Sequence, residues 1–274
     1  MSYLLALDQG TTSSRAIIFN EHGQIQATAQ RETHIQTPHS GWVEQDAQEI
    51  WSSQIAVVQQ ALATARILAK DIKAIGLTNQ RETTVVWDRH NGKPLAPAII
   101  WQDRRATDWC NLLIQQGQMD QVQRKTGLRI DPYFSAGKLV WLLENIDGLR
   151  TLAEQGHVAF GTIDSWLIWN LTQGAEHIIE ASNASRTMLM NLQTQRWDDE
   201  LLDLFNIPAS VLPRIISSDC HIADTAPGLL GATIPITGIL GDQQSALFGQ
   251  SCFEPGMAKN TYGTGCFMLF NTGH

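Results

Sequence analysis

The sequence lacks the features that usually mark exported, membrane-bound or nucleic-acid-binding proteins. No apolar run in its 274 residues approaches the ~18 needed for a transmembrane helix, and no basic segment precedes the first apolar stretch. The formal net charge of −8 leaves no excess of basic residues for a nucleic-acid backbone or an anionic membrane. We therefore expect a cytoplasmic protein that neither inserts into a membrane nor binds nucleic acid.

Cysteine pairs and the common nucleotide-binding motifs are also missing. The four cysteines lie far apart without a C-x-x-C pair, which is more typical of reduced thiols than of a disulfide framework or a zinc site. The sequence has no Walker-type G-x-x-x-x-G-K-[ST] loop, no G-x-G-x-x-G after a strand, and no G-x-S-x-G or H-E-x-x-H motif. A polyanionic ligand would therefore have to be held by local arginines, backbone N–H groups or a metal ion.

The stretch from residue 4 to residue 19 is the first that suggests chemistry. Two apolar runs, Leu4–Leu7 and Ala16–Phe19, have the length and branching of strands buried on both faces. Between them lie Asp8, the four consecutive hydroxyls Thr11–Ser14, and Arg15. Such a turn suits phosphate oxygens, and a carboxylate at a strand end can hold a metal through its water shell. An ordinary Gly-Thr hairpin with solvated hydroxyls is the alternative.

The order of the following elements indicates the fold class. A third strand is expected at Ile25–Glu32. A helix then begins after Asp46, with Glu49 as its reciprocal cap and a face made of Ala47, Trp51, Ile55, Val58, Leu62 and Ala65. Ile72–Leu77 reads as a parallel strand, because a crossover helix precedes it. This is the order of an α/β ribonuclease H-like domain: three antiparallel strands of a mixed sheet, then parallel strands, with helices on both faces.

The rest of the chain is expected to form further helices and strands. We expect a hairpin of Thr84–Trp87 and Ala98–Trp101, helices within 106–160, a strand at Val158–Gly161, a helix at Ile163–Leu171 capped by Thr162 or Asp164, a strand at Pro235–Leu240, a helix at Ser245–Gln250 and strand-like sequence at Lys259–Phe270.

Polar groups recur where these strands end, which is where open α/β sheets bind ligands. Asp8 and Asp242 each follow an apolar strand, so they could converge on one cleft, one holding a metal and the other accepting a proton from a hydroxyl. The alternative is that each only caps a turn or a helix. Phosphoryl transfer needs mainly positioning, charge neutralisation and one base, which this pair could supply.

Other side chains near the strand ends could bind a polyol. Arg81 and Glu82 could clasp vicinal hydroxyls, or form only a surface ion pair worth under ~1 kcal/mol. Trp101 and Phe267 could pack against the carbon side of such a ligand, or belong to the core. Tyr133, in a proline-containing loop, could donate a hydroxyl or be a packed ring.

These residues together resemble the FGGY family of carbohydrate kinases, and within it the glycerol kinases, over essentially the whole chain. Asp8–Arg15 is similar to the first phosphate motif of the family. Asn79–Thr83 and Trp101–Arg105 are similar to the substrate-site segments, Gly241–Gln244 to the catalytic-base segment, and Tyr262–Phe267 to the start of the second domain.

The resemblance implies an actin-like pair of ribonuclease H-fold domains with the active site between them. It implies ATP-dependent phosphorylation of glycerol to sn-glycerol 3-phosphate with Mg²⁺, and Asp242 as the base that activates the attacking hydroxyl. By motif, the glycerol site would comprise Arg81, Glu82, Trp101, Tyr133, Asp242, Gln243 and Phe267. The nucleotide phosphates would contact Thr11, Thr12, Ser13, Arg15 and Thr264, and Asp8 would hold Mg²⁺ through water.

The length of the chain departs from the family pattern. Family members run to roughly twice this length, consistent with a missing domain of ordinary size. We therefore expect residues 1–251 to form the first domain and residues 252–274 to begin a truncated second one. The missing C-terminal domain would be the partner of this fragment, which should be inactive alone, and the full-length protein a homo-oligomer. Some bacterial members of the family use an arginine in the corresponding Gly-rich loop for inhibition by a sugar bisphosphate. Here that loop, Gly228–Thr233, has no arginine, so this inhibition is not expected.

Three alternatives remain at this stage. One is an FGGY kinase for another polyol or sugar, and another is a non-catalytic, actin-like nucleotide-binding module. The third is a true nuclease of the ribonuclease H type, which needs several clustered carboxylates and a basic face that the sequence does not supply.

Overall fold

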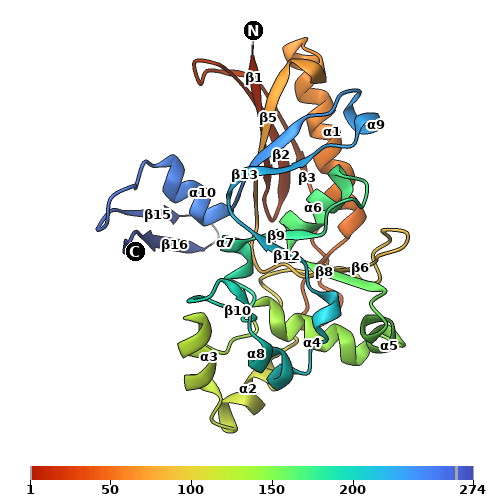
Figure 1. Cartoon of the computed structure of the whole chain (residues 1–274), viewed down its shortest axis with the longest axis vertical. Coiled ribbons are helices and arrows are strands. Elements are labelled where there is room, and N and C mark those ends of the chain that lie inside the picture. The colour runs from red at the N-terminus through yellow and green to blue at the C-terminus, as the bar shows by residue number, and fades with distance from the viewer. Residues whose placement is uncertain (1, 263–264, 274) are drawn as a thin grey trace.

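The computed structural model describes residues 2–262 and 265–273. Figure 1 shows a twisted sheet with its helices in the upper half, a mostly helical lobe below it, and a small arm to one side. No helix among the described residues is long and apolar enough to cross a membrane.

The central sheet has six strands and mixed direction. Its order is β13-β14-β5-β1-β2-β3, with β1, β5 and β14 parallel and the other three antiparallel to their neighbours. The strands span Tyr3–Gln9 (β1), Ser13–Asn20 (β2), Ile25–Glu32 (β3), Ile72–Asn79 (β5), Asp219–Asp224 (β13) and Pro235–Gly241 (β14). The predicted antiparallel trio, crossover helix and parallel strand are confirmed.

The two faces of this sheet are covered unequally. Helix α1 (Ala47–Ala65) packs on β2 and β3, and α6 (Ile163–Leu171) packs beside it on β5. Helix α10 (Asp242–Gly249) reaches the opposite face near the carboxyl ends of β5 and β14. Burial therefore alternates along β1 and β2, and the expectation that these strands are buried on both faces is wrong.

Helix α1 begins as predicted but presents a different face. Asp46 caps it by accepting hydrogen bonds from the amides of Gln48 and Glu49, whereas the predicted reciprocal cap is absent because the Glu49 carboxylate lies 2.6 Å from His34 Nδ1. Trp51 and Leu62 are only half-buried. The buried positions are Ala47, Ile50, Ser53, Gln54, Val57, Val58 and Ala61, because the twist of the sheet sets the side from which the helix packs.

The lower lobe forms a second apolar core. Its elements are β4 (Glu44–Gln45), β6 (Val85–Asp88), β7 (Ala98–Ile99), α2 (Thr107–Gln115), α3 (Met119–Thr126), α4 (Ser135–Asn145), α5 (Leu149–Glu154), β8 (Val158–Gly161) and α8 (Asp199–Phe205). The two arms of the predicted hairpin, residues 84–87 and 98–101, do not form a continuous ladder with each other. β6 pairs with β8 and β7 pairs with β4, while isolated bridges such as Thr84 to Ile99 join the two arms. Each arm thus forms its ladder with a strand from elsewhere in the chain.

The shorter elements connect these bodies. They are β9 (Ile178–Glu180), α7 (Ala181–Ala184), β10 (Met190–Asn191), β11 (Arg196–Trp197), β12 (Arg214–Ile216), α9 (Pro227–Leu230) and 3₁₀ turns at Ala69–Asp71 and Ala209–Val211. The bounds of β8 and α6 match the predicted ones. Thr162 occupies the N-cap position of α6, as predicted, but its side chain makes no capping hydrogen bond: the Thr162 hydroxyl donates to Asp164, whose other oxygen accepts from the Glu180 amide. Helix α10 begins at Asp242, three residues before the predicted start.

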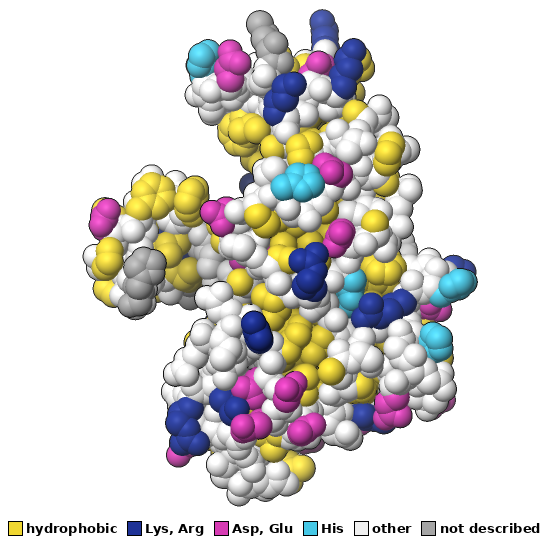
Figure 2. All heavy atoms as spheres, in the orientation of Figure 1, with side chains coloured by type: hydrophobic (Ala, Val, Ile, Leu, Met, Phe, Trp, Pro, Cys, Tyr) yellow, Lys and Arg dark blue, Asp and Glu magenta, His cyan; other side chains and the backbone are white. Residues whose placement is uncertain are grey.

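The side arm consists of α10 and the hairpin of β15 (Ala258–Tyr262) and β16 (Cys266–Phe270). The hairpin forms a separate two-stranded sheet. Figure 2 shows hydrophobic side chains gathered on this arm. Tyr262 and Met268 are 78% and 68% exposed, and Phe248, Phe253 and Phe270 are exposed as well. This is the largest group of exposed apolar side chains among the described residues, and such surfaces usually mark contacts with another protein part.

Candidate active site

The candidate site lies where the three parallel strands of the sheet end. In the register of the sheet, Asp8 of β1 is opposite Thr78 of β5, and Gly241 of β14 is opposite Asn79. Asp242 follows Gly241 directly, so both strand-end carboxylates reach the same edge. Burial raises the pKa of Asp8, the positive charge of Arg15 lowers it, and the negative charge of Asp242 raises it. The two carboxylates therefore interact electrostatically.

A cleft of about 420 Å³ opens at this edge. Nine of the residues predicted from sequence line it: Thr11, Thr12, Arg81, Glu82, Trp101, Tyr133, Asp242, Gln243 and Phe267. Asp8, Ser13 and Arg15 are not part of the lining, and Thr264 lies outside the described residues. The lining also includes Ile35 and Thr261, which were not predicted, and Gln102 and Gly265, which belong to the predicted motif segments but were not named as site residues.

Glu82 is held rigidly in this cleft. Its φ of 63° lies in the left-handed region that a non-glycine residue rarely adopts. The hydroxyls of Ser135 and Thr84 donate to its carbonyl at 3.0 and 3.3 Å. Arg186 Nε donates to the buried carboxylate at 2.6 Å. The backbone strain is thus offset by contacts on both ends of the residue, and the carboxylate is fixed in one orientation.

Arg81 lies across the end of β14 and meets Asp242. Its Nε is 3.0 Å from Asp242 Oδ1, close enough for an ion pair, but the N–H is not aligned for a hydrogen bond to any described residue. A Cβ at Gly241 would lie 2.6 Å from Arg81 Cδ, so only glycine leaves room for the side chain there. A buried donor without an acceptor is costly unless a ligand supplies one. The pair is therefore more than a surface ion pair.

Aromatic rings wall the cleft beside these charges. Trp101 is in edge-to-face contact with Tyr133 and Phe267, with ring centroids 5.9 and 6.0 Å apart. Trp101 Nε1 also donates to Thr11 Oγ1 at 2.8 Å, which joins this wall to the β1–β2 turn. Burial raises the pKa of Tyr133 to about 12, so its hydroxyl stays a donor at neutral pH. The three rings leave apolar surface next to hydrogen-bonding groups.

The β1–β2 turn is more open than this wall. Arg15 Nη1 is 3.6 Å from Asp8 Oδ2, and their side chains are 39% and 38% exposed. Gln30 Nε2 donates to the Ser13 hydroxyl at 3.2 Å, and Thr12 is exposed. Thr12 and the Arg15 guanidinium thus reach solvent, as a site for a charged ligand would require, whereas the Ser14 hydroxyl is buried against Gln9 and Ser53.

The donor set at this edge fits Mg²⁺ better than a transition metal. No group of three or more His, Cys, Asp or Glu side chains among the described residues could hold a metal by itself. Mg²⁺ needs no such group, because it usually binds through one or two carboxylates, several waters and the phosphates of a substrate. Asp8 and Asp242 meet that requirement.

Two bracing residues were missed by sequence reasoning. Arg186 lies 104 positions from Glu82, and no motif signals their contact. Lys138 is fully buried and donates to the carbonyls of Pro132, Tyr133 and Phe134 at 2.9, 2.6 and 3.2 Å. A lysine inside an otherwise apolar helix face was the available signal, because buried lysines are rare without a partner.

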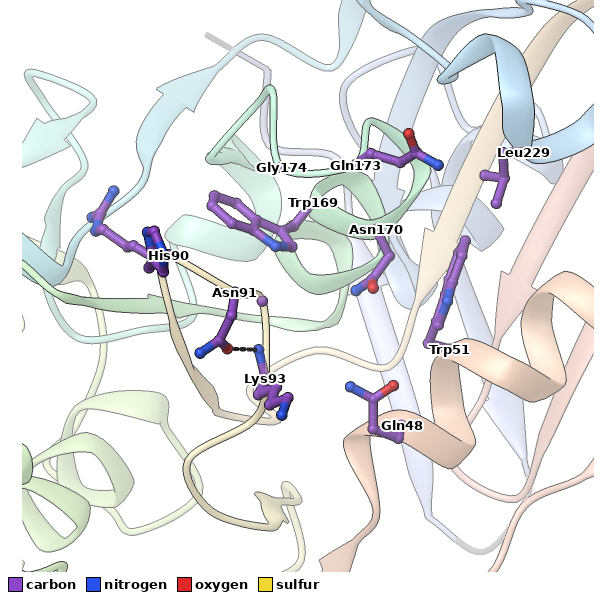
Figure 3. A pocket seen from close by; sticks show the side chains of 12 residues that line it. Gln48, Trp51, His90, Asn91, Lys93, Trp169, Asn170, Gln173, Gly174 and Leu229 are labelled. Carbon is purple, nitrogen blue, oxygen red and sulfur yellow. Dashed lines mark hydrogen bonds between the residues drawn. The ribbon is translucent and has the colours of Figure 1, made fainter.

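A second hollow, of about 510 Å³, lies away from this edge (Figure 3). Trp51 and Trp169 stand on its walls, with the carboxamides of Gln48, Asn170 and Gln173 between and around them. Its lining has no carboxylate, and Asn91 there only closes its own turn by accepting from the Lys93 amide. His90 lines this hollow, but no carboxylate or cysteine accompanies it there, so the candidate chemistry belongs to the cleft.

The sequence matches known proteins along its full length. Residues 3–249 match the model of the FGGY family of carbohydrate kinases, N-terminal domain. A glycerol kinase from Acinetobacter baylyi is 83% identical over 273 residues, which are 100% of this chain and 55% of that protein. A glycerol kinase from Alcanivorax borkumensis is 59% identical, with the same coverage. The chain spans about half the length of the curated relatives it matches.

Solved structures agree with the fold. The crystal structure of Plasmodium falciparum glycerol kinase with ADP matches with a TM-score of 0.94 at 37% identity, over 100% of this chain and 55% of that one. A xylulose kinase from Rhodospirillum rubrum matches with a TM-score of 0.88 at 22% identity, over 97% of this chain and 54% of that one. The second likeness shows the fold alone. The actin-like, ribonuclease H-like fold class expected from the strand order is confirmed.

Proposed function

The chain belongs to the FGGY family of carbohydrate kinases, and we propose that the full-length protein transfers the γ-phosphoryl group of ATP to glycerol, giving sn-glycerol 3-phosphate and ADP. The observation that carries this proposal is the arrangement of Arg81, Glu82 and Asp242 in an aromatic-walled cleft. The relatives named above, glycerol kinases from two bacteria and from Plasmodium falciparum, point to the same substrate.

The cleft offers a hydrogen-bond donor and a hydrogen-bond acceptor to a pair of vicinal hydroxyls. Arg81 has a buried N–H without an acceptor, and Glu82 has a carboxylate held in place by Arg186. A donor and an acceptor on adjacent residues suit two vicinal hydroxyls, while the rings of Trp101 and Phe267 suit the carbon side. A small polyol therefore fits better than a charged or a purely apolar ligand.

Asp242 is the proposed base. Its Oδ1 accepts from the Gln243 amide at 2.7 Å, and Gln243 Nε2 approaches Oδ2 at 3.3 Å. Together with Arg81, these contacts fix the direction of the carboxylate. A base in that place would take the proton of the attacking hydroxyl as the phosphoryl group is transferred.

The phosphate groups of ATP are assigned to the β1–β2 turn. Thr11, Thr12, Ser13 and Arg15 would contact them, together with Thr264. Asp8 would hold Mg²⁺ through water, and the bound ion would neutralise phosphate charge. The exposure of Asp8 and Arg15 supports this assignment, because a solvated pair can exchange partners at little cost.

The second wall of the nucleotide site is assigned to the part of the longer relatives that lies outside the half matched by this chain. In this proposal residues 1–251 are the first domain and residues 252–274 begin the second. The exposed apolar side chains on α10 and the β15–β16 hairpin support it, because such a surface suits a domain contact. The free cysteines suit the proposed cytoplasmic location. The homo-oligomer stays a prediction, for light scattering of the full-length protein to test.

A coupled ADP assay of the full-length protein on a panel of polyols and sugars tests the function. We expect turnover with glycerol well above that with xylulose, gluconate or erythritol. Faster turnover with another polyol or sugar would show that glycerol is not the preferred substrate. Nucleotide binding without phosphate transfer to any member of the panel would instead support a non-catalytic module.

A further inference from the structure

The backbone that carries the proposed base is held from outside its own strand and helix. Asp242 is the first residue of α10, and the amide of Gly241 just before it donates to Ser182 Oγ at 2.9 Å. Ser182 belongs to the short helix α7, 59 residues away in sequence. Figure 1 shows α7 where the sheet meets α10. This one hydroxyl thus joins a separate segment to the strand–helix turn.

A buried carboxylate in turn holds that hydroxyl. Ser182 Oγ donates to Glu180 Oε2 at 2.5 Å, and the Ser182 amide donates to Oε1 at 2.8 Å. Glu180 is completely buried, and no ion pair with a Lys or Arg forms among the described residues. Ser218 Oγ and both nitrogens of Asn183 complete its shell of donors. An unpaired buried charge is tolerated only where hydrogen bonds replace its hydration.

Helix capping alone does not explain this shell. A cap of α7 needs only the amides of Ser182 and Asn183. The hydroxyls of Ser182 and Ser218 are additional donors, and both serines also accept a hydrogen bond from the central sheet. The Ser218 carbonyl accepts from the Ile239 amide of β14, and Ser182 accepts from Gly241. Both contacts hold the carboxyl-terminal end of β14.

A second route reaches the same turn from β5. Asn183 and Asn79 exchange side-chain hydrogen bonds at 2.9 and 3.2 Å, and both are fully buried. Asn79 lies opposite Gly241 in the parallel ladder. Glu180 therefore sits at the centre of a polar network that reaches Gly241, directly before Asp242, and Asn79, the ladder partner of Gly241.

We propose that Glu180 is a positioning residue for phosphoryl transfer, acting through Ser182 to hold the Gly241–Asp242 turn so that the Asp242 carboxylate faces the substrate hydroxyl beside Arg81. The inference rests on the proposed function of Asp242 as base. Proton transfer requires the base within hydrogen-bond reach of the hydroxyl, and a displacement of about 1 Å can cost up to ~100-fold in rate. Among the described residues, Ser182 makes no hydrogen bond to a residue that lines the cleft.

The test compares three variants of the full-length enzyme. Ser182→Ala removes the hydroxyl, and we expect kcat to fall about 10- to 100-fold while the KM for glycerol changes less than about twofold. Ser182→Thr keeps the hydroxyl on a half-buried position and should restore most of kcat. Ser185→Ala is the matched control, because the hydroxyl of Ser185, the C-cap residue of α7, donates to the Ser182 carbonyl at 2.7 Å and not to Gly241.

Amide hydrogen exchange of the segment 241–249 gives a readout that is independent of activity. Ser182→Ala should speed exchange there, and Ser185→Ala should not. Unchanged exchange and kcat in Ser182→Ala, or equal losses in both variants, overturn the inference. If the wild-type enzyme does not phosphorylate glycerol, the proposed function fails by itself, and the exchange data still decide whether Ser182 holds the turn. Glu180→Gln should act in the same direction as Ser182→Ala, and where it fails to fold the serine variants decide.

Discussion

On one side of the cleft, Arg81 and Glu82 are almost fully buried, and each is held by a second residue. We call these two residues, with Trp101 and Tyr133, the alcohol side. On the other side, in the β1–β2 turn, the side chains of Asp8 and Arg15 are each more than a third exposed and their ion pair spans 3.6 Å. We call this turn the phosphate side.

The difference follows from the ligands each side is proposed to take. A neutral polyol offers only hydrogen bonds, so its partners must be oriented in advance and shielded from water, where such bonds are strong. A nucleotide phosphate carries charge that acts over a longer range, and hydrated side chains can adjust to it. Burial and bracing are therefore concentrated where recognition is weakest per contact. Four predictions test this contrast, beginning with the largest effect.

Removal of the proposed base should have the largest effect. In the full-length enzyme, Asp242→Asn keeps the shape of the side chain but removes the proton acceptor, so kcat should fall by about 10²- to 10⁴-fold. Glycerol binding, measured by calorimetry, should persist because the alcohol side is intact. Asp219→Asn, on an exposed position of β13, is the control. A kcat within threefold of wild type would remove Asp242 as the base.

Loss of the Arg186 contact should damage the alcohol side next. Arg186→Leu leaves the buried Glu82 carboxylate without its cation, and we expect the KM for glycerol to rise about tenfold. The free energy of unfolding in urea should fall by about 1–3 kcal/mol, since Arg186 is itself partly exposed. Arg214→Leu breaks the exposed pair with Glu176 and should cost less than ~1 kcal/mol. Equal effects of the two substitutions would contradict the bracing role.

The titration of Lys138 should have a smaller effect. As the pH rises, glycerol binding should weaken, whereas the contribution of Lys138 to the free energy of unfolding should increase. Burial lowers the pKa of its amine to about 8, against the opposing charges of Glu82, Asp103, Cys110 and Asp131. Above pH 8 the neutral amine has two hydrogens for three carbonyls, so the Tyr133 loop loosens and the KM for glycerol should rise about threefold to fivefold between pH 7 and 9.

Stability should move the other way in the alkaline range. The pKa of Lys138 in the unfolded chain is near the ordinary 10.5, so between pH 8 and 10.5 the unfolded state binds more protons than the folded state. The contribution of Lys138 to the free energy of unfolding therefore rises with pH in this window. Urea unfolding of Lys138→Met should lack that rise. A KM for glycerol that is flat from pH 7 to 9, or one that rises together with the KM for ATP, would contradict the loop mechanism.

The smallest effect is expected on the phosphate side. Arg15→Gln removes an exposed cation, so the free energy of unfolding should change by less than ~1 kcal/mol. The KM for ATP should rise about twofold to threefold and the KM for glycerol should stay constant. A large loss of stability, or a change in the KM for glycerol, would show that the two sides are not built as differently as their burial indicates.

Much of the fold could be predicted because its signals are local. Alternating or continuous apolar runs of four to eight residues placed β1, β3, β5 and β8, and the crossover helix made β5 parallel. The errors arose where local signals compete with packing. Glu49 was expected as a cap but pairs with His34, and β6 was expected in a hairpin but pairs with β8. Caps and strand partners depend on which neighbours the folded chain brings near.

The sequence by itself determined that Asp8, Arg81, Glu82 and Asp242 stand at strand ends, and the parallel order of those strands made their meeting predictable. It also carried the motifs that identify the family. Only the tertiary structure decided which side chains support them: Arg186 for Glu82, Lys138 for the Tyr133 loop, and Glu180 with Ser182 for the Asp242 turn. These partners are separated in sequence and share no period, so only packing and strand register bring their polar atoms within hydrogen-bond distance.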